Sequence, residues 1–382
     1  MDVTAIVLRC TPSSFQVMPH RTGTANLPLH TGKAPRWLFD RMSQLAPAIA
    51  EIIVLEHGRS EFLRRLSDPY WFQAFGCVLG FDWHSSGVTT TVCGALKEGL
   101  AHRSNELGVF VAGGKGKASR RTPMELTTYG EQLGLDGARL AYNSRMAAKV
   151  DSAAVQDGFG IYHHSFFVTT EGEWAVVQQG MREHDGTARR YHWLGSQLKD
   201  FVNEPHAAIA SDARTETVLN MVASESQQAR SVSTDFARQE PRAVGREIAR
   251  MITMALPSRH WVDIERDVNP AHLQKVLLST YEANPQNFEE LLAVPGVGPK
   301  AVRALALVAE VVYGSPASSR DPARFSFAHG GKDGTPYPVN RVVYDQSVDW
   351  LRDAVSKARI GHTDRLKALK RLAEWSEEPS GQ

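Results

Sequence analysis

The chain has 382 residues, of which 42% are apolar and 22% are charged, a composition typical of a soluble globular protein with two or three domains. The formal net charge of +1 excludes a global basic field, so any affinity for nucleic acid must come from local patches. Three cysteines without metal-ligand spacing exclude a complete disulfide set and favour a reducing compartment. No stretch approaches the roughly 20 apolar residues of a membrane span. The N-terminus also lacks a signal-peptide pattern, so we expect a cytoplasmic protein without a membrane partner.

The first predicted elements are a helix over residues 35–53 and an apolar run over residues 74–83. Apolar residues recur at helical spacing in the first segment, and we interpret the second as a strand. Asp82 and His84 would then lie on the same side of the chain at the strand's end, where sites are commonly built. An aspartate and a histidine together suit a divalent cation. The alternative is that both side chains cap the turn that follows.

A basic segment, GGKGKASRR, follows at residues 113–121. Its glycines and cations favour a mobile loop that can lie along phosphates, and a merely solvated loop fits the pattern equally well. Lys115, Lys117 and Arg120 are therefore candidate DNA contacts.

Polar side chains between residues 149 and 179 are more numerous than a core hairpin needs. Aromatic and β-branched residues on both sides of Gly172 predict a β-hairpin over residues 161–181. His163 and His164 are adjacent on its first strand, so they point to opposite faces. Metal-assisted hydrolysis of a phosphodiester uses carboxylates to hold the metal, and Lys or His to move protons. The candidate catalytic residues are Asp82, His84, Lys149, Asp151, Asp157, His164 and Gln179.

The carboxylates and one histidine of this set are the candidate metal ligands, for a divalent ion that we expect to be Mg²⁺ or Mn²⁺. These ligands are Asp82, His84, Asp151 and Asp157. Asp157, Gln179 across the hairpin and Lys149 resemble the restriction-nuclease pattern of acid, acid or amide, and lysine. The sequence Gln178-Gln179-Gly180 replaces the usual Glu-x-Lys element of that pattern.

Cations alternate with aromatic residues in the segment RRYHW, residues 189–193. This pattern suits phosphate contact combined with base stacking, and a solvated strand edge is the alternative. Arg189 and Arg190 are therefore further candidate DNA contacts.

The composition changes near residue 204, where aromatics become scarce and Ala, Ser, Glu, Gln and Arg dominate. We predict an α/β (or α+β) catalytic domain over residues 1–203, with a sheet that contains the hairpin, and a helical connector over residues 204–242. Residues 243–382 are predicted to form an all-α DNA-binding domain.

The segment at residues 284–314 has the pattern of two helices joined by the turn VPGVGPK. Asn284 with Pro285 predicts the start of the first helix, and Pro299 predicts the first residue of the second. Gly296 and Gly298 leave backbone amides bare at a helix N-terminus, which favours a phosphate, and Lys300 adds a charge. Such a helix-hairpin-helix holds nucleic-acid backbone without reading sequence. The alternative is a glycine-rich turn between core helices.

Several strings taken together, among them LPLHTGKAPRWLFDRM, AVQDGFGIYHHSFF and FAHGGKDGTPYPV, resemble the archaeal and bacterial family called domain of unknown function 763 over nearly the whole chain. This resemblance implies no catalytic residues. The hairpin is also similar to that of endonuclease III-type glycosylases, where a lysine at the position of Lys300 can be the amine nucleophile. The assisting aspartate of those enzymes is not in place here, because Ser318 lies near that spacing and Asp321 and Asp333 are displaced.

The leading hypothesis is a DNA-binding protein that hydrolyses DNA with a divalent metal, in repair or recombination. It would bind DNA without sequence preference, and the sequence does not define its oligomeric state. One alternative is a helix-hairpin-helix glycosylase or lyase that uses Lys300. The other is a non-catalytic DNA-binding scaffold.

Overall fold

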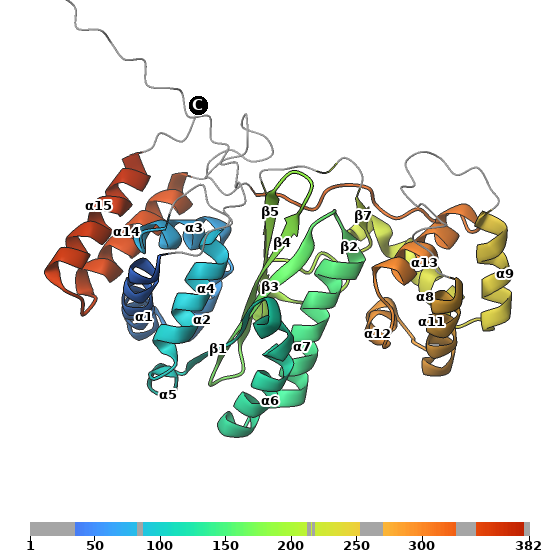
Figure 1. Ribbon diagram of the computed structural model, residues 1–382, viewed down its shortest axis with the longest axis horizontal. Coiled ribbons are helices and arrows are strands. Elements are labelled where there is room, and N and C mark those ends of the chain that lie inside the picture. The colour runs from blue at the N-terminus through green and yellow to red at the C-terminus, as the bar shows by residue number, and fades with distance from the viewer. Residues whose placement is uncertain are drawn as a thin grey trace, which may run out of the picture.

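The computed structural model describes residues 35–81, 87–211, 215, 218–252, 270–325 and 341–377. It has a mixed α/β fold around a five-stranded antiparallel sheet of order β1-β3-β4-β5-β6 (Figure 1). The strands are β1 (Val109–Lys115), β3 (Gly160–Thr169), β4 (Trp174–Arg182), β5 (Thr187–Leu194) and β6 (Ala208–Ala210). A separate pair joins β2 (Val155–Gln156) to β7 (Leu219–Asn220). The coarse prediction of a mixed α and β fold is therefore confirmed.

The predicted β-hairpin is confirmed, because β3 and β4 pair antiparallel from Gly160 with Met181 to Val168 with Trp174. Gly172 occupies the turn with a φ of +83°, a backbone conformation that glycine adopts without strain. Helices cover both faces of the sheet, so the strand residues are buried on both sides instead of alternating with solvent. The sheet is consequently an internal layer of the molecule.

The N-terminal helices cover one face of the sheet (Figure 1). They are α1 (Arg36–His57), α2 (Arg59–Leu66), α3 (Pro69–Val78), α4 (Gly87–Leu100) and α5 (Ser104–Leu107). The predicted helix at residues 35–53 corresponds to α1. The predicted strand at residues 74–83 is wrong, because its first five residues belong to α3. Asp68 caps this helix by accepting from the amides of Tyr70 and Trp71, and Pro69 is its first residue, so start signals upstream of the apolar run decide its structure.

Two helices, α6 (Thr122–Leu133) and α7 (Gly137–Lys149), cover the opposite face, where they pack on Phe166, Val176 and Trp193. The basic segment at residues 113–121 is not the predicted loop. Its first three residues end β1, and the others form the 3₁₀ helix η1 (Gly116–Arg121). At its C-terminus α7 passes into a short π-helix, η2 (Val150–Ala154), a rare element that often marks a functional site.

A helical unit lies beside the sheet, at the right in Figure 1. It comprises α8 (Gln227–Ala237), α9 (Pro241–Ile252), α11 (Pro270–Ala283), α12 (Phe288–Ala293) and α13 (Pro299–Val311). Two further 3₁₀ helices, η3 (Gly195–Gln197) and η4 (Ser224–Ser226), are not part of this unit. Its apolar residues continue the core on the α7 side of the sheet. The helical unit and this side of the sheet therefore share one hydrophobic core.

The chain is divided differently from the prediction. The segment 204–242 is not only a helical connector, because β6 completes the main sheet and β7 pairs with β2. The last two helices, α14 (Arg341–Lys357) and α15 (His362–Glu377), do not continue the helical unit. They pack on α1 and α3, where Leu351, Val355 and Leu372 join the N-terminal core (Figure 1). None of the helices within the described ranges is both long and apolar enough to cross a membrane.

Candidate nucleic-acid interface and the polar network beside it

The turn between α12 and α13 presents backbone and charge to solvent. Gly296 has a φ of +89°, and Gly298 precedes the first residue of α13, Pro299. Gly296 and Lys300 are exposed, whereas Val297 between the glycines is buried and fixes the turn to the core. The first amides of a 13-residue helix therefore lie beside an exposed lysine.

The start of the first helix differs from the prediction. Asn284 has a φ of +47° after the end of α11 and does not cap α12. Asn287 is the cap, since its side chain accepts from the amide of Glu290 at 2.9 Å. Both asparagines precede an apolar run. Asn284 was predicted as the cap because Pro285 follows it, and a proline is common at the first position of a helix. The helix is consequently short, and the turn that follows it is as predicted.

A glutamine of β2 anchors the N-terminus of α13. The Nε2 of Gln156 donates to the carbonyl of Pro299 at 2.8 Å, and its Oε1 accepts from the Nε of Arg303 at 2.7 Å. The same side chain also donates to the carbonyl of Ala153 in the π-helix. One residue thus connects the turn, the π-helix and β2, so the N-terminus of α13 is held in a fixed position.

The cations of η1 lie at the same end of the sheet as β2. Lys115 pairs in register with His163 near the start of β3, and β2 precedes that start by three residues. Lys115, Lys117 and Arg120 are all exposed. These three predicted DNA contacts are therefore exposed near the end of the sheet where β3 begins.

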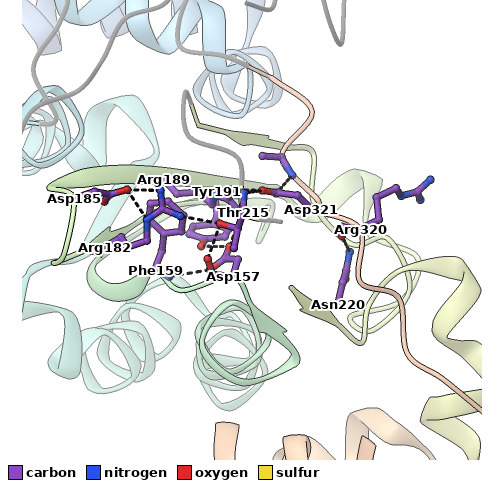
Figure 2. A network of polar contacts seen from close by, with 11 residues as sticks. Asp157, Phe159, Arg182, Asp185, Arg189, Tyr191, Thr215, Asn220, Arg320 and Asp321 are labelled. Carbon is purple, nitrogen blue, oxygen red and sulfur yellow. Dashed lines mark hydrogen bonds and ion pairs between the residues drawn. The ribbon is translucent and has the colours of Figure 1, made fainter. Parts of the chain in front are cut away.

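A buried network of charges begins one residue after Gln156. The Oδ2 of Asp157 accepts from the Nη1 of Arg189 at 2.8 Å and from the hydroxyl of Tyr191 at 2.7 Å, and its Oδ1 accepts from the amide of Phe159. Arg189 donates from its other terminal nitrogen to Asp321 at 2.7 Å (Figure 2). One guanidinium with 0% exposed side chain thus lies between two carboxylates.

The network ties the sheet to segments far along the chain. Asp321 accepts from the backbone amides of Thr215 and Ala323, and the Thr215 hydroxyl donates to the carbonyl of Asp157 (Figure 2). Although burial lowers the pKa of Arg189, its two carboxylate neighbours outweigh that effect and raise it. Burial, followed by the charge of Asp157, raises the pKa of Tyr191 well above its usual value. Arg189 stays a cation and Tyr191 stays a hydrogen-bond donor.

A second cluster on the same face centres on Asp151 in the π-helix. Its Oδ2 accepts from Gln178 at 2.5 Å and from the indole of Trp193 at 2.9 Å, and its Oδ1 contacts the Nε2 of His206 at 2.5 Å. Burial raises the pKa of Asp151, and His206 opposes that effect. Gln178 also contacts the Nδ1 of His164 at 2.8 Å. Asp151 and His164 are therefore linked through one amide, as neighbours in a single buried cluster.

These contacts bear on the predicted metal ligands. Both oxygens of Asp151 and both of Asp157 already have protein partners, which is the arrangement of carboxylates that hold a fold together. Among the side chains that the structure describes, no three His, Cys, Asp or Glu residues are grouped as a metal would need. The other two predicted ligands, Asp82 and His84, lie outside the described residues. The Mg²⁺ or Mn²⁺ site stays a prediction.

Gln179 does not meet Asp157. Its Nε2 donates to the hydroxyl of Tyr162, on the sheet face opposite the one where Gln178 contacts Asp151. Successive strand residues point to opposite faces, so a glutamine pair puts only one amide on each side. The predicted grouping of Asp157, Gln179 and Lys149 is therefore not assembled.

The two predicted arginine contacts are wrong for the conformation described. Arg189 and Arg190 are 0% exposed, because β5 lies inside the sheet with helices over both faces. Arg190 points to the face of α3, where it donates to the side chain of Gln73 and to the carbonyl of Pro69, both at 3.1 Å. Neither arginine can reach a phosphate, so the alternation of cations and aromatics reflects buried pairing.

Lys149 ends α7 directly before the π-helix and is partly buried. Burial lowers the pKa of its amine. A lysine that loses its proton more readily can accept one during chemistry. Lys149 is thus a predicted catalytic residue whose pKa is shifted in the direction that a proton acceptor needs.

Sequence reasoning did not assign to these clusters the residues that complete them, namely Gln178, Tyr191, His206 and Asp321. Strand alternation could have identified Gln178, since it shares the parity of Val176 and Trp174 on the α7 face. No local pattern points to His206 or Asp321. They come from distant segments, and the fold alone brings them to Asp151 and Arg189.

A comparison with protein families matches residues 23–339 to the family described as "Protein of unknown function (DUF763)". The match covers most of the chain, and the protein belongs to this family. No curated protein and no solved structure matches the chain.

Proposed function

We propose that the protein binds the backbone of DNA at the turn at residues 294–300. The observation that carries this proposal is the exposed N-terminus of α13, with its glycine turn and Lys300, anchored by Gln156. Backbone amides and a lysine suit phosphate oxygens and do not read bases, so binding is expected without sequence preference. We expect the exposed cations Lys115, Lys117 and Arg120 to contribute further phosphate contacts.

The test compares binding of a fluorescently labelled DNA duplex by the wild type and by Gly298→Val. Gly298 has a φ of −124°, which any residue adopts, and a Cβ there has no heavy atom closer than 4.0 Å. The variant should fold normally, while its side chain keeps phosphate away from the amides. We expect at least tenfold weaker binding, and a log–log salt slope that is shallower by about 0.9 for each lost contact.

Gln228→Val serves as the matched control, because Gln228 is exposed on α8 and is not part of the turn. Its affinity should equal that of the wild type. Equal affinity and slope for Gly298→Val in a folded protein would show that the turn is only structural. Absence of duplex binding by the wild type at low salt would reject the proposal as a whole.

Metal-dependent hydrolysis of bound DNA, in repair or recombination, is the second function that we propose. It is favoured by the partly buried Lys149 beside a π-helix, with Asp157 one residue from the anchor of the turn. Because Asp151 and Asp157 are already engaged, the metal would need ligands beyond them, and Asp82 and His84 are the sequence candidates.

Labelled single-stranded, duplex, branched and abasic DNA incubated with Mg²⁺, Mn²⁺ or chelator tests hydrolysis. We expect cleavage with metal, its loss with chelator, and its loss in Asp82→Ala with duplex affinity retained. Binding of every substrate without cleavage would assign the scaffold alternative instead. Cleavage of abasic DNA alone, in chelator, would favour the lyase alternative.

A further inference from the structure

A cavity of about 770 Å³ lies between α1, the end of α4 and the start of α15. In Figure 1 these helices are at the left, on the far side of the sheet from α13. The cavity is therefore separate from the proposed DNA surface. Its volume falls within the range of small-molecule sites, which is about 300–1,000 Å³.

The lining of the cavity carries more positive than negative charge. Its cations are Arg41, Arg103, Arg359, Lys367 and Arg371, and its carboxylates are Glu51 and Asp364. In a protein whose formal net charge is only +1, this local excess is a feature of the cavity and not of the chain. Because a concave wall concentrates the field of its charges, the cavity favours a small polyanion.

Two of the cations hold the two carboxylates. Arg103 binds Glu51 through both terminal nitrogens, at 2.7 and 2.6 Å, and these hydrogen bonds lower the pKa of Glu51. Asp364 lies 3.8 Å from Arg41. Both acids thus have a cationic neighbour in the wall. Arg359, Lys367 and Arg371 remain as further cations, and the charge of Arg359 also contributes to lowering the pKa of Glu51.

The remaining cations include two that face solvent. Arg371 donates to the carbonyl of Val78, so it is fixed in the wall. Arg359 and Lys367 are exposed, and neither forms an ion pair with a described side chain. They are placed to meet phosphate oxygens without first breaking a salt bridge.

An aromatic ring stands at the same cavity. Trp37 lines it and is 63% exposed, and the guanidinium of Arg41 lies 5.8 Å from its ring centroid. A large apolar ring left in solvent beside cations offers a stacking surface for a planar base. The cavity thus combines cations that suit phosphate groups with an aromatic ring that suits a base.

We propose that this cavity binds a nucleoside triphosphate, with its phosphates on Arg359 and Lys367 and its base on Trp37. The inference goes beyond the proposed DNA binding, because it uses a different surface. Trp37 and Arg103 lie within the family match at residues 23–339, whereas Arg359 and Lys367 lie outside it. The proposed base contact therefore lies inside the part that the family match covers, and the two proposed phosphate contacts lie after it.

Calorimetric titration of the full chain with ATP and with tripolyphosphate tests the proposal. We expect ATP to bind about tenfold more tightly than tripolyphosphate, which lacks the base that Trp37 would stack. The double variant Arg359→Ala with Lys367→Ala should weaken both ligands at least tenfold. Trp37→Ala should lower only the affinity for ATP, to that of tripolyphosphate.

All three positions are exposed, so the variants should fold, and circular dichroism checks that they do. Lys275→Ala on α11 removes an exposed cation elsewhere and should leave both affinities unchanged. Undetectable ATP binding, equal binding of the two ligands by the wild type, or unchanged affinities in the double variant would overturn the proposal. The double variant should still bind duplex DNA, and Gly298→Val should still bind ATP, so failure of either site is recognised separately.

Discussion

A phosphate contact and an amine nucleophile are the two alternative roles of Lys300, and they place different requirements on its side chain. It is exposed at the first turn of α13, and the displaced candidate for an assisting acid, Asp321, is already bonded to Arg189 and to Thr215. Both features favour a phosphate contact. The other displaced candidate, Asp333, lies outside the described residues.

We therefore expect Lys300→Arg to retain duplex affinity and any activity, because the charge is kept. Lys300→Ala should lose up to about tenfold in affinity and reduce the log–log salt slope by about 0.9. Labelled-duplex titrations at several salt concentrations measure both effects. Loss of activity in Lys300→Arg with normal affinity would instead assign the amine nucleophile, since a guanidinium cannot act as one.

Asp157 illustrates how burial changes the consequence of losing a charge. It shares the fully buried Arg189 with Asp321, so Asp157→Asn leaves that guanidinium with one carboxylate. We expect the free energy of unfolding to fall by about 3 kcal/mol, a typical cost of breaking a buried ion pair. Urea unfolding measures the change.

Asp185→Asn provides the matched control in the same network. Asp185 is bonded to Arg182 near the surface, so its loss should cost about 1 kcal/mol or less. Equal costs for the two variants would show that the buried pair contributes no more than the exposed one. Because an Asp157 variant is expected to be less stable, its loss of cleavage would not identify a metal ligand. The metal test therefore uses Asp82.

At the scale of elements, the contact between β2 and α13 determines whether the turn is rigid. Gln156→Ala removes the hydrogen bonds to Pro299 and Arg303, each worth about 1 kcal/mol. Amides in the turn at residues 294–300 should then exchange their hydrogens faster, while the helices remain folded. Duplex affinity should fall several-fold, because a looser turn must be ordered on binding.

Gln228→Ala on α8 is the control, and its exchange rates should match those of the wild type. Unchanged exchange in Gln156→Ala would mean that Val297 and the apolar core are sufficient to hold the turn. Hydrogen exchange followed by mass spectrometry resolves this segment.

Elements with a local signal were predictable. The hairpin of β3 and β4 has aromatic and β-branched residues on both sides of a turn glycine, and Pro299 starts α13 because its fixed φ suits that position. The structure of residues 74–83 was not predictable, because apolar residues alone do not distinguish a buried helix from a buried strand. There the cap at Asp68 decides, several residues upstream.

The candidate site was predictable only in part, because periodicity gives the face of a side chain but not its partner. Asp151, Asp157 and His164 were chosen as polar residues near the hairpin, and all three do lie in the buried clusters. Arg189 was expected at the surface, since sequence does not show that helices cover both faces of β5. Its acid partners are Asp157, directly after β2, and Asp321, and only the fold brings these segments together.

At the scale of the whole molecule, the sheet separates two groups of helices that carry different surfaces. The turn at residues 294–300 belongs to the helical unit on one side, and the cationic cavity belongs to α1 and α15 on the other (Figure 1). Each side has its own large hydrophobic cluster, and the sheet contributes to both. Polar residues buried within the sheet should therefore affect the stability of the whole chain and not of one surface.

Three such residues are histidines, and they make the stability of the chain depend on pH. Burial lowers the pKa of His163 to about 3 and that of His164 to about 4, and it lowers the pKa of His192 well below its usual value. The unfolded chain binds protons at these histidines below about pH 6.5, whereas the folded chain keeps them neutral. Their contribution is thus fully present above pH 6.5 and is lost as the pH falls towards 4.

We expect the free energy of unfolding, measured with urea between pH 7.5 and pH 5, to decrease by up to about 1.4 kcal/mol per pH unit for each histidine below pH 6.5. His164→Gln should make this dependence less steep, because one titrating group is removed while the amide can still bond to Ser144 or Gln178. His184→Gln, at a side chain that is 74% exposed, should leave the dependence unchanged. A stability that stays constant from pH 7 to pH 5 would mean that these histidines accept protons in the folded chain, and hence that water reaches the interior of the sheet.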